Sequence, residues 1–290
     1  MIRSSLPHVH VAALSHAGMS GKDNEDRYAI SSFLLSKEDP RPAILAVVAD
    51  GIGGHLAGEI AAELAVNYIT AGVAESNGKK PVKILETAIQ NASQSIASHS
   101  AGKEDENGMG ATCACVWIIE NKLYTAYVGD SRIYLLRGKF IQRLTIDHTW
   151  VQEAYEKGII TAEQMHDHPN LHVIRRYLGG VRLPEVDFRL RIDDAESNEE
   201  SENNQGFNLE PGDTILLCSD GLTDLVWDDE IQRIIRSKKE MKAAAEALVN
   251  LANERGGHDN ITVVIMSTPK LEETAQKKRN ILDWLLGEEE

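Results

Sequence analysis

The sequence places acidic residues at the ends of several apolar runs, and carboxylates are the side chains that bind hard metal ions in proteins. Glu25 and Asp26 stand in the charged stretch 22–27, directly before an apolar run. Asp50 and Asp220 each end an apolar run, and a glycine follows each of them. Any one of these acids fits a turn or a helix cap, where Asp is common. As a set, they are also candidate ligands of a cation.

Two more acids stand in the same setting. Asp130 follows a glycine at the end of an apolar run, and Asp259 precedes the last such run. If the runs are strands that lie side by side, the acids converge and repel one another unless a cation neutralises them. Oxygen ligands without Cys or His indicate Mg²⁺ or Mn²⁺. A neighbouring glycine lets a backbone carbonyl or a water approach the ion.

The elements that must position these acids are mostly strands that follow one another as hairpins. The apolar and alternating patterns predict strands at residues 43–50, 111–119, 122–130, 132–136, 139–144, 186–192, 213–220 and 261–266. Turns are expected at Glu120–Asn121 and at Arg137–Gly138. Helical spacing marks residues 58–69, 82–96 and 241–257. Because strands outnumber helices and pair as hairpins, the sequence favours antiparallel sheets covered by helices.

Two of these patterns also place apolar side chains on one face. The first helix carries apolar side chains at i, i+4 and i+8, which are Ile60, Leu64 and Tyr68. Residues 186–192 alternate, and the apolar face consists of Val186, Phe188, Leu190 and Ile192. Polar residues 193–206 form an acidic stretch that is expected to be a mobile loop. The tail, residues 270–290, is expected to be helical, and it either docks on its own domain or binds a partner.

Composition excludes some classes of protein. The net charge is −15, from 30 Lys and Arg against 45 Asp and Glu, which argues against a nucleic-acid binder. No apolar run reaches the roughly 18 residues that cross a bilayer. Cys113, Cys115 and Cys218 are too few for a disulfide framework. These features fit a reducing cytoplasm, and we expect a monomer.

Seven stretches, taken in chain order, resemble the motifs of the bacterial type 2C metal-dependent (PPM) Ser/Thr protein phosphatases. They are NEDR, VVADGIGGHLAGEIA, GATCACVW, YVGDSRIYLLR, LTIDHTWVQEAYEKGIITAEQ, LCSDGLTD and GGHDNITVVI. The resemblance covers about residues 9–268 and implies one phosphatase domain. The implied fold is α+β, a four-layer αββα sandwich of two antiparallel sheets flanked by helices. A flap-like region is expected at about residues 147–180.

The resemblance also implies a role for each acid. Asp50 would bridge two Mn²⁺ or Mg²⁺ ions, and Gly51 would offer its carbonyl. Asp220 and Asp259 would hold one ion and Glu25 the other, while Asp26 would orient the attacking water. Asp130 would hold a weaker third ion, as in bacterial members. The implied reaction is hydrolysis of phosphoserine and phosphothreonine in proteins that a cognate kinase has modified.

The substrate side is less complete. Family members usually carry an Arg that contacts the substrate phosphate, and here that position is Gly21. Lys22 could reach the phosphate without the bidentate fork of Arg. Arg27 or Arg132 could instead compensate, although a structural pair with a nearby acid is the favoured role for Arg132. His55 is a candidate acid for the leaving group or a loop residue that only caps or orients.

Two alternative functions remain. The chain could be a catalytically weakened relative that binds phosphoproteins as a scaffold or sensor, and the missing Arg is the observation in its favour. It could also act on one small phosphorylated partner, as sporulation-type relatives do. The intact set of acids argues against the first alternative, and the flap-like region argues against the second.

Overall fold

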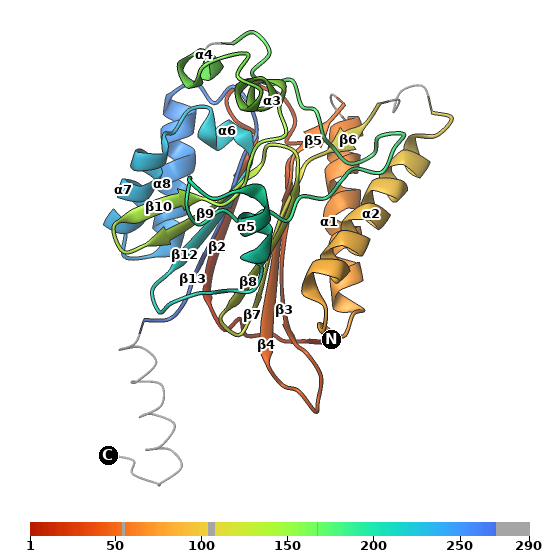
Figure 1. Cartoon of the computed structure of the whole chain (residues 1–290), viewed down its shortest axis with the longest axis vertical. Helices are drawn as coiled ribbons and strands as arrows, with labels where there is room; N and C mark the ends of the chain where they lie inside the picture. The colour runs from red at the N-terminus through yellow and green to blue at the C-terminus, as the bar shows by residue number, and fades with distance from the viewer. Residues whose placement is uncertain (54–55, 104–107, 167, 271–290) are drawn as a thin grey trace.

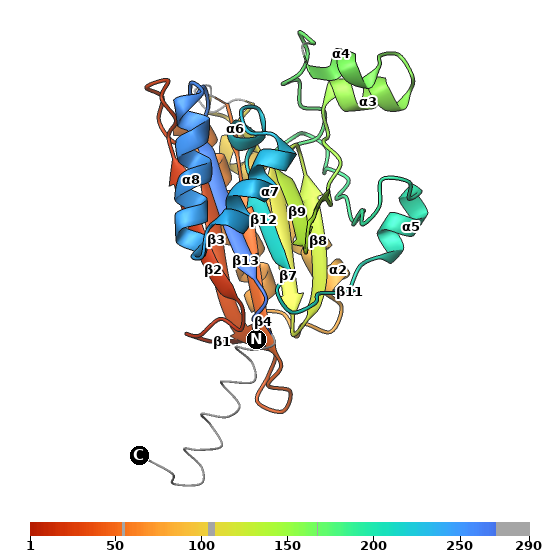
Figure 2. The same cartoon turned by 90° about the vertical axis from the view of Figure 1, so that its left-hand side faces the viewer.

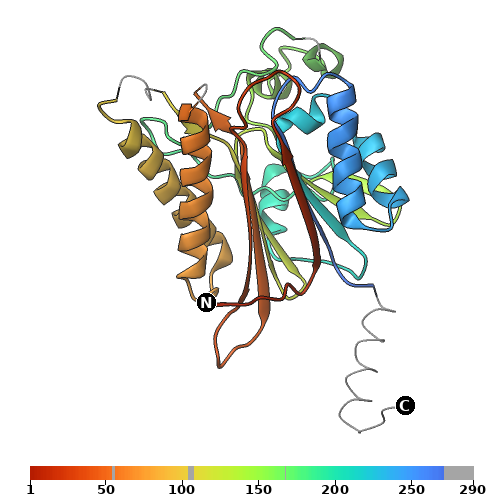
Figure 3. The same cartoon turned by 180° about the vertical axis from the view of Figure 1, so that it is seen from behind.

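The structure, a computed structural model, describes residues 1–53, 56–103, 108–166 and 168–270. Two β-sheets pack face to face, and helices cover their outer faces (Figure 1). Seen from behind, α1 and α2 flank one side and α8 the other (Figure 3). Every strand pair in the two sheets is antiparallel. The predicted αββα sandwich is therefore confirmed.

The strands divide into two large sheets and a short pair. The first sheet has the order β1 (Ile2–Arg3), β3 (Arg27–Leu34), β4 (Pro42–Ala49), β7 (Cys113–Ile119), β8 (Lys122–Val128) and β11 (Phe207–Asn208). The second has the order β10 (Phe140–Arg143), β9 (Arg132–Arg137), β12 (Thr214–Cys218), β13 (Ile261–Ser267) and β2 (His10–His16). The short pair is β5 (Gly51–Ile52) and β6 (Gly110–Ala111).

The helices lie outside the sheets and beyond one end of them (Figure 2). On the six-stranded side are α1 (Leu56–Ala74) and α2 (Pro81–Ser100). On the five-stranded side are α6 (Asp220–Thr223), α7 (Asp228–Ser237) and α8 (Met241–Glu254). The remaining helices are α3 (Trp150–Glu156), α4 (Ala162–His166) and α5 (Asn198–Asn203). No helix in the described ranges is long and apolar enough to cross a bilayer.

Three apolar layers hold the sandwich together. Alternation along β4 sends Leu45 and Val47 toward α1 and α2, and Ile44 into the layer between the sheets. The third layer, which includes Leu216 and Leu248, joins the five-stranded sheet to α7 and α8. Strand β4 is therefore covered on both faces, which explains its uninterrupted apolar sequence.

The first helix forms as predicted, but its apolar stripe is only partly buried. Of Ile60, Leu64 and Tyr68, the first two are partly buried and pack against the core. Tyr68 is 46% exposed, while Ala61 and Ala65 are fully buried. Helix α1 packs close to α2, where a Cβ added to Gly72 would lie 2.9 Å from the Ala88 Cβ. Small residues therefore make the contact, and a pattern based on large apolar residues misses them.

The two predicted hairpins form with small differences. Ile119 pairs with Lys122, so Glu120–Asn121 is the turn, and Glu120 adopts a φ of 56°. In the second hairpin Arg137 pairs with Phe140. The turn is therefore Gly138–Lys139, one residue later than predicted.

The predicted strand at residues 186–192 is wrong. The segment forms only an isolated bridge between Asp187 and Tyr127 within the described chain. Its next backbone bonds go elsewhere, because Leu190 N–H donates to the Ser201 carbonyl and Arg191 N–H to the Leu144 carbonyl. The alternation arises because the segment runs along the domain and buries its apolar residues in two different layers.

The acidic stretch 193–206 is not simply a loop, because it contains α5. Ser197 caps this helix, and Glu200 completes a capping box. Ser201 is buried, and the Gln205 side chain bonds to Thr125 and to the Phe188 carbonyl. The tail predicted to be helical lies outside the described residues from 271 onward.

Candidate metal centre

Five acidic segments from distant parts of the chain meet at one end of the sandwich. Strand β3 begins there and β4 ends there, because Arg27 pairs with Ala49. This pairing brings Asp26 next to Asp50. Strand β8 ends there before Asp130, β12 ends before Asp220, and β13 begins after Asp259. The antiparallel arrangement thus gathers acids that the sequence spreads over more than 230 residues.

Asp50 is held by its backbone. The Thr112 hydroxyl accepts a hydrogen bond from the Asp50 N–H at 3.0 Å, and Thr112 N–H donates to the Asp50 carbonyl at 2.8 Å. The same hydroxyl bonds to Ser131 Oγ at 2.7 Å. Thr112 is fully buried and therefore links the loop of Asp50 to the loop of Asp130.

Glu25 and Gly51 meet at the start of α1. A Cβ added to Gly58 would overlap the Glu25 carboxylate and lie 3.0 Å from the Gly51 carbonyl oxygen. A Cβ on Gly51 would in turn overlap the Gly58 carbonyl. Two glycines thus permit the close backbone approach that places a carboxylate and a carbonyl side by side.

The five-stranded sheet contributes acids whose neighbours hold the N-terminal loop. Ser219 donates from its hydroxyl to Asp26 Oδ2 at 2.7 Å and accepts from the Thr262 N–H at 2.9 Å. Asn260 accepts from the Glu25 N–H at 2.7 Å. Residues adjacent to Asp220 and Asp259 therefore fix Glu25 and Asp26 from the opposite sheet.

The environment opposes negative charge on these groups. Burial raises the pKa of Asp26 to about 7, with added repulsion from Asp220 and Asp259, while the Ser219 hydroxyl acts in the opposite direction. Burial, followed by repulsion from neighbouring carboxylates, also raises the pKa of Asp50 and Asp130. For Asp220, burial and then repulsion from Asp259 raise the pKa. Four carboxylates therefore share one site that their own charges destabilise.

The arrangement fits a divalent cation. Asp26 Oδ1, Asp130 Oδ1 and Asp220 Oδ1 are buried oxygens with no hydrogen-bond partner among the described residues. Buried polar atoms normally have a partner. A hard cation prefers such oxygens and would remove the repulsion between them. The donor set present here is therefore the set that Mg²⁺ or Mn²⁺ requires.

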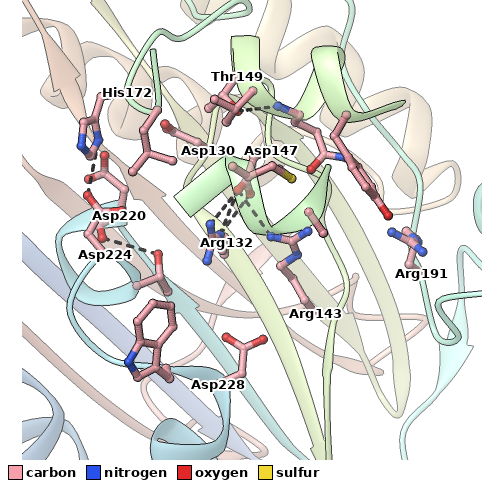
Figure 4. Close-up of a pocket in the computed structure, with 18 of the residues that line it drawn as sticks. Asp130, Arg132, Arg143, Asp147, Thr149, His172, Arg191, Asp220, Asp224 and Asp228 are labelled. Carbon is pink, nitrogen blue, oxygen red and sulfur yellow. Dashed lines mark hydrogen bonds and ion pairs between the residues drawn. The ribbon is translucent and has the colours of Figure 1, made fainter. Parts of the chain in front are cut away.

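A cavity of about 1010 Å³ opens beside Asp130 and Asp220 (Figure 4). Residues 147–180, which we call the flap, form one wall, and α6 with the start of α7 forms another. In the flap, His172 Nδ1 lies 3.4 Å from Asp224 Oδ2. These two residues and Asp220 have ligand atoms within 4.8 Å of one another. The flap thus reaches the edge of the acidic centre.

The basic residues considered for the substrate phosphate differ in whether an acid already pairs with them. Arg132 makes a bidentate contact with Asp147, with distances of 2.7 to 3.1 Å (Figure 4). Arg27 pairs with Glu59. Both guanidinium groups are therefore committed to structural pairs, as favoured for Arg132. Lys22 is exposed in the loop that precedes Asp26.

Gly21 and His55 are the remaining positions that were named for the substrate side. Gly21 has a φ of 75°, a conformation that glycine adopts readily and other residues avoid. A Cβ at Gly21 would meet no atom within 4 Å. His55, the candidate acid, lies outside the described residues.

The sequence did not reveal the residues that hold the acids in place. Thr112, Ser219 and Asn260 act through bonds to the backbone or side chains of distant segments. His148 makes similar bonds to Gly129. In the sequence, these four residues are marked only by standing close to an acid in the chain or by lying inside one of the quoted motifs.

Known proteins resemble this chain over most of its length. The sequence matches the family profile "Protein phosphatase 2C" over residues 15–263. The serine/threonine phosphatase stp of Listeria monocytogenes serotype 4b (strain F2365) is 32% identical over 262 residues, which cover 89% of this chain and 95% of the relative. The match therefore extends over nearly the whole of that relative.

Solved structures show the same fold. The serine/threonine phosphatase of S. agalactiae superposes with a TM-score of 0.77 at 29% identity, covering 90% of this chain and 99% of that one. The catalytic domain of the phosphatase PstP, in complex with two manganese ions, gives a TM-score of 0.72 at 31% identity, with 90% and 99% coverage. On the extent of the profile match and of the sequence identity, the chain belongs to the protein phosphatase 2C family.

Proposed function

We propose that the protein is a metal-dependent serine/threonine protein phosphatase that hydrolyses phosphoserine and phosphothreonine monoesters with the aid of two Mn²⁺ or Mg²⁺ ions. The observation that carries this proposal is the meeting of Asp26, Asp130 and Asp220, each with a buried, unpartnered carboxylate oxygen in the described structure. Membership of the family and the two manganese ions in a relative support the same chemistry.

The residues divide between the ions as follows. Asp50, which lies between the other acids, would contact both ions. Glu25 and the Gly51 carbonyl would hold one ion, because Gly58 lets them lie side by side. Asp220 and Asp259, from the five-stranded sheet, would hold the other. Asp130 would hold a weaker third ion at the mouth of the cavity.

Two bound ions would lower the pKa of a water between them and offset the charge that develops on the phosphoryl group. Asp26 would orient that water through Oδ1, because the Ser219 hydroxyl already donates to Oδ2. Lys22 would contact the phosphate as a point charge. His55 would protonate the leaving alkoxide.

The cavity beside the centre is where the peptide that carries the phosphate would lie. It extends from Asp130 and Asp220 outward between the flap and α7. We propose that the substrates are proteins that a Ser/Thr kinase has phosphorylated in the same cytoplasm. We also propose that the phosphatase acts as a monomer.

The test is hydrolysis of p-nitrophenyl phosphate and of a phosphothreonine peptide by the purified chain. We expect turnover of both substrates with Mn²⁺ or Mg²⁺ and loss of turnover after EDTA, with recovery when Mn²⁺ is restored. Turnover that survives complete chelation would exclude the proposed mechanism.

A catalytically weakened phosphoprotein binder is a second candidate, and Gly21 in place of the phosphate-binding Arg favours it. That role predicts saturable binding of phosphopeptides with no metal-dependent release of phosphate. Measuring binding by calorimetry and phosphate release on the same peptide separates the two functions.

A further inference from the structure

The loop that carries Asp130 is attached to the root of the flap. Gly129 N–H donates to His148 Nδ1 at 3.0 Å, and His148 N–H donates to the Gly129 carbonyl at 3.0 Å. Both polar groups of the Gly129 backbone are therefore bonded to one residue. Since Gly129 directly precedes Asp130, this pair of bonds fixes the peptide from which the Asp130 carboxylate projects.

A second contact secures the other side of the loop. Arg132, two residues after Asp130, is bound in bidentate fashion by Asp147, through Nε to Oδ1 and Nη2 to Oδ2. Asp147 and His148 are neighbours in the chain, so one dipeptide holds the loop on both sides of the acid. The loop has little freedom, because a Cβ on Gly129 would lie 2.6 Å from the Thr112 side chain.

The His148 ring is fixed in one orientation. It is 5% exposed and stacks on Tyr127, with ring centroids 5.3 Å apart. Its Nε2 lies 3.1 Å from Asp187 Oδ2, and Arg189 holds that carboxylate in turn. Because Nδ1 accepts a hydrogen bond, the proton of the neutral ring is on Nε2 and donates to Asp187. Burial lowers the pKa of His148, which keeps this neutral form.

The same residue joins the two ends of the flap. The His148 carbonyl accepts a hydrogen bond from Arg175 N–H at 2.7 Å. The next residue, Thr149, forms a β-bridge with Ile174. His148 therefore connects the segment that enters the flap, the segment that leaves it, and the Asp130 loop.

We propose that His148 is a positioning residue that holds the Asp130 carboxylate in place for a cation and couples it to the flap. The proposal rests on the proposed function, because it assumes that Asp130 binds a divalent ion. Asp130 is 6% exposed, and its Oδ1 has no partner in the described part of the chain. Its place in the site thus depends on how its backbone is held.

Two substitutions separate the two bonds of the ring. In His148→Asn, the amide oxygen takes the place of Nδ1 and still accepts from Gly129 N–H. In His148→Gln, the longer side chain donates to Asp187 but leaves Gly129 N–H without its acceptor. We expect His148→Gln to raise the Mn²⁺ dissociation constant of the weakest class of sites about tenfold. His148→Asn should change this constant less than threefold. Free Mn²⁺ measured by electron paramagnetic resonance reports this binding without turnover.

His168→Gln is the matched control. His168 is also a flap histidine that stacks on an aromatic ring, Trp150, and its Nδ1 also accepts a backbone hydrogen bond, from Asn170. Neither contact involves the Asp130 loop. We expect this variant to bind Mn²⁺ as the wild type does.

Three results would overturn the proposal. The first is that His148→Gln binds Mn²⁺ at every site as tightly as the wild type does. The second is that both His148 variants lose the same amount of Mn²⁺ affinity, in proportion to their loss of melting temperature. The third is that the wild type has no third, weaker class of Mn²⁺ sites. Failure of the proposed function would appear differently, as a wild-type protein that shows no EDTA-sensitive hydrolysis.

Discussion

The carboxylates of the candidate metal centre suit cation binding but destabilise the folded chain. Asp26 is buried, and its hydrogen bond from Ser219 does not offset the burial and the repulsion by its neighbours. Such a residue weakens the folded chain when no cation is present. This cost in stability fits the proposed role of these acids in cation binding, because functional sites often carry such strain.

Asp26 contributes to the pH dependence of stability, in the same direction as Asp50, Asp130 and Asp220. Its pKa is about 7 in the folded chain against an ordinary value of 3.8, so the folded state binds more protons between these values. The free energy of unfolding should therefore fall as pH rises from about 4 to 7, by about 1.4 kcal/mol for each unit of pKa difference at most. Urea unfolding in EDTA at pH 5 and pH 7.5 measures this loss. Asp26→Asn should reduce it, and an unchanged pH profile in that variant would contradict the assignment.

Substitution of the ligands should separate activity from stability. Asp50→Ala and Asp220→Ala should each lower kcat by at least on the order of 10²-fold, because each would remove a proposed ligand of an ion at the reacting phosphate. In EDTA their melting temperatures should match or exceed that of the wild type, since a repelling carboxylate is gone. Asp194→Ala, at the outer edge of the cavity, is the control. A near-normal kcat in either ligand variant would show that the ligands are wrongly assigned.

Lys22 is the residue to test for phosphate binding. Lys22→Ala should raise KM for a phosphopeptide severalfold and leave kcat within about twofold, because a ground-state contact is lost. Lys80→Ala, on the far side of the domain at the start of α2, controls for the loss of one positive charge. An unchanged KM would mean that another group binds the phosphate.

At the scale of elements, strand register does most of the positioning. The pairing of Arg27 with Ala49 and of Cys218 with Val263 sets four acidic segments at one edge. The flap is a separate element at that edge, and its contact between His172 and Asp224 connects it to the residue that caps the end of α6.

The flap contact can be tested on its own. His172→Ala should increase hydrogen exchange of backbone amides in residues 150–171, because it removes a bond between the flap and the sandwich. Exchange in α1 and α2 should stay unchanged. Equal exchange in the variant and the wild type would mean that other contacts hold the flap against the sandwich.

Some elements were predictable from sequence, and others depended on tertiary contacts. The strands that end in acids have strong apolar patterns, so their existence and the convergence of Asp50, Asp130 and Asp220 could be inferred. The fully buried face of α1 could not, because it consists of small residues such as Ala61 and Ala65, and Gly72 meets Ala88 of α2. Residues 186–192 alternate as a strand does, yet their backbone bonds go to several different segments. The positioning role of His148 requires knowing that residue 129 lies beside residue 148.

At the scale of the whole molecule, charge affects how substrates arrive. The net charge of −15 should attract cationic phosphopeptides through long-range electrostatics, which salt screens. We expect kcat/KM for a lysine-rich phosphopeptide to fall severalfold between 50 mM and 500 mM salt, with little change for p-nitrophenyl phosphate. A peptide of the same length with glutamates in place of lysines is the control. Equal salt dependence for all three substrates would show that the charge does not steer binding.

The metal centre also spans the boundary between the two sheets. Asp50 and Asp130 follow strands of the six-stranded sheet, whereas Asp220 and Asp259 adjoin strands of the five-stranded one. An ion held by Asp50 together with Asp220 and Asp259 would link the two sheets at one end of the sandwich and resist sliding of the sheets past each other. Catalysis and the packing of the two sheets would then depend on the same few atoms. Removal of the ion would let the sheets separate at the end that carries the metal centre.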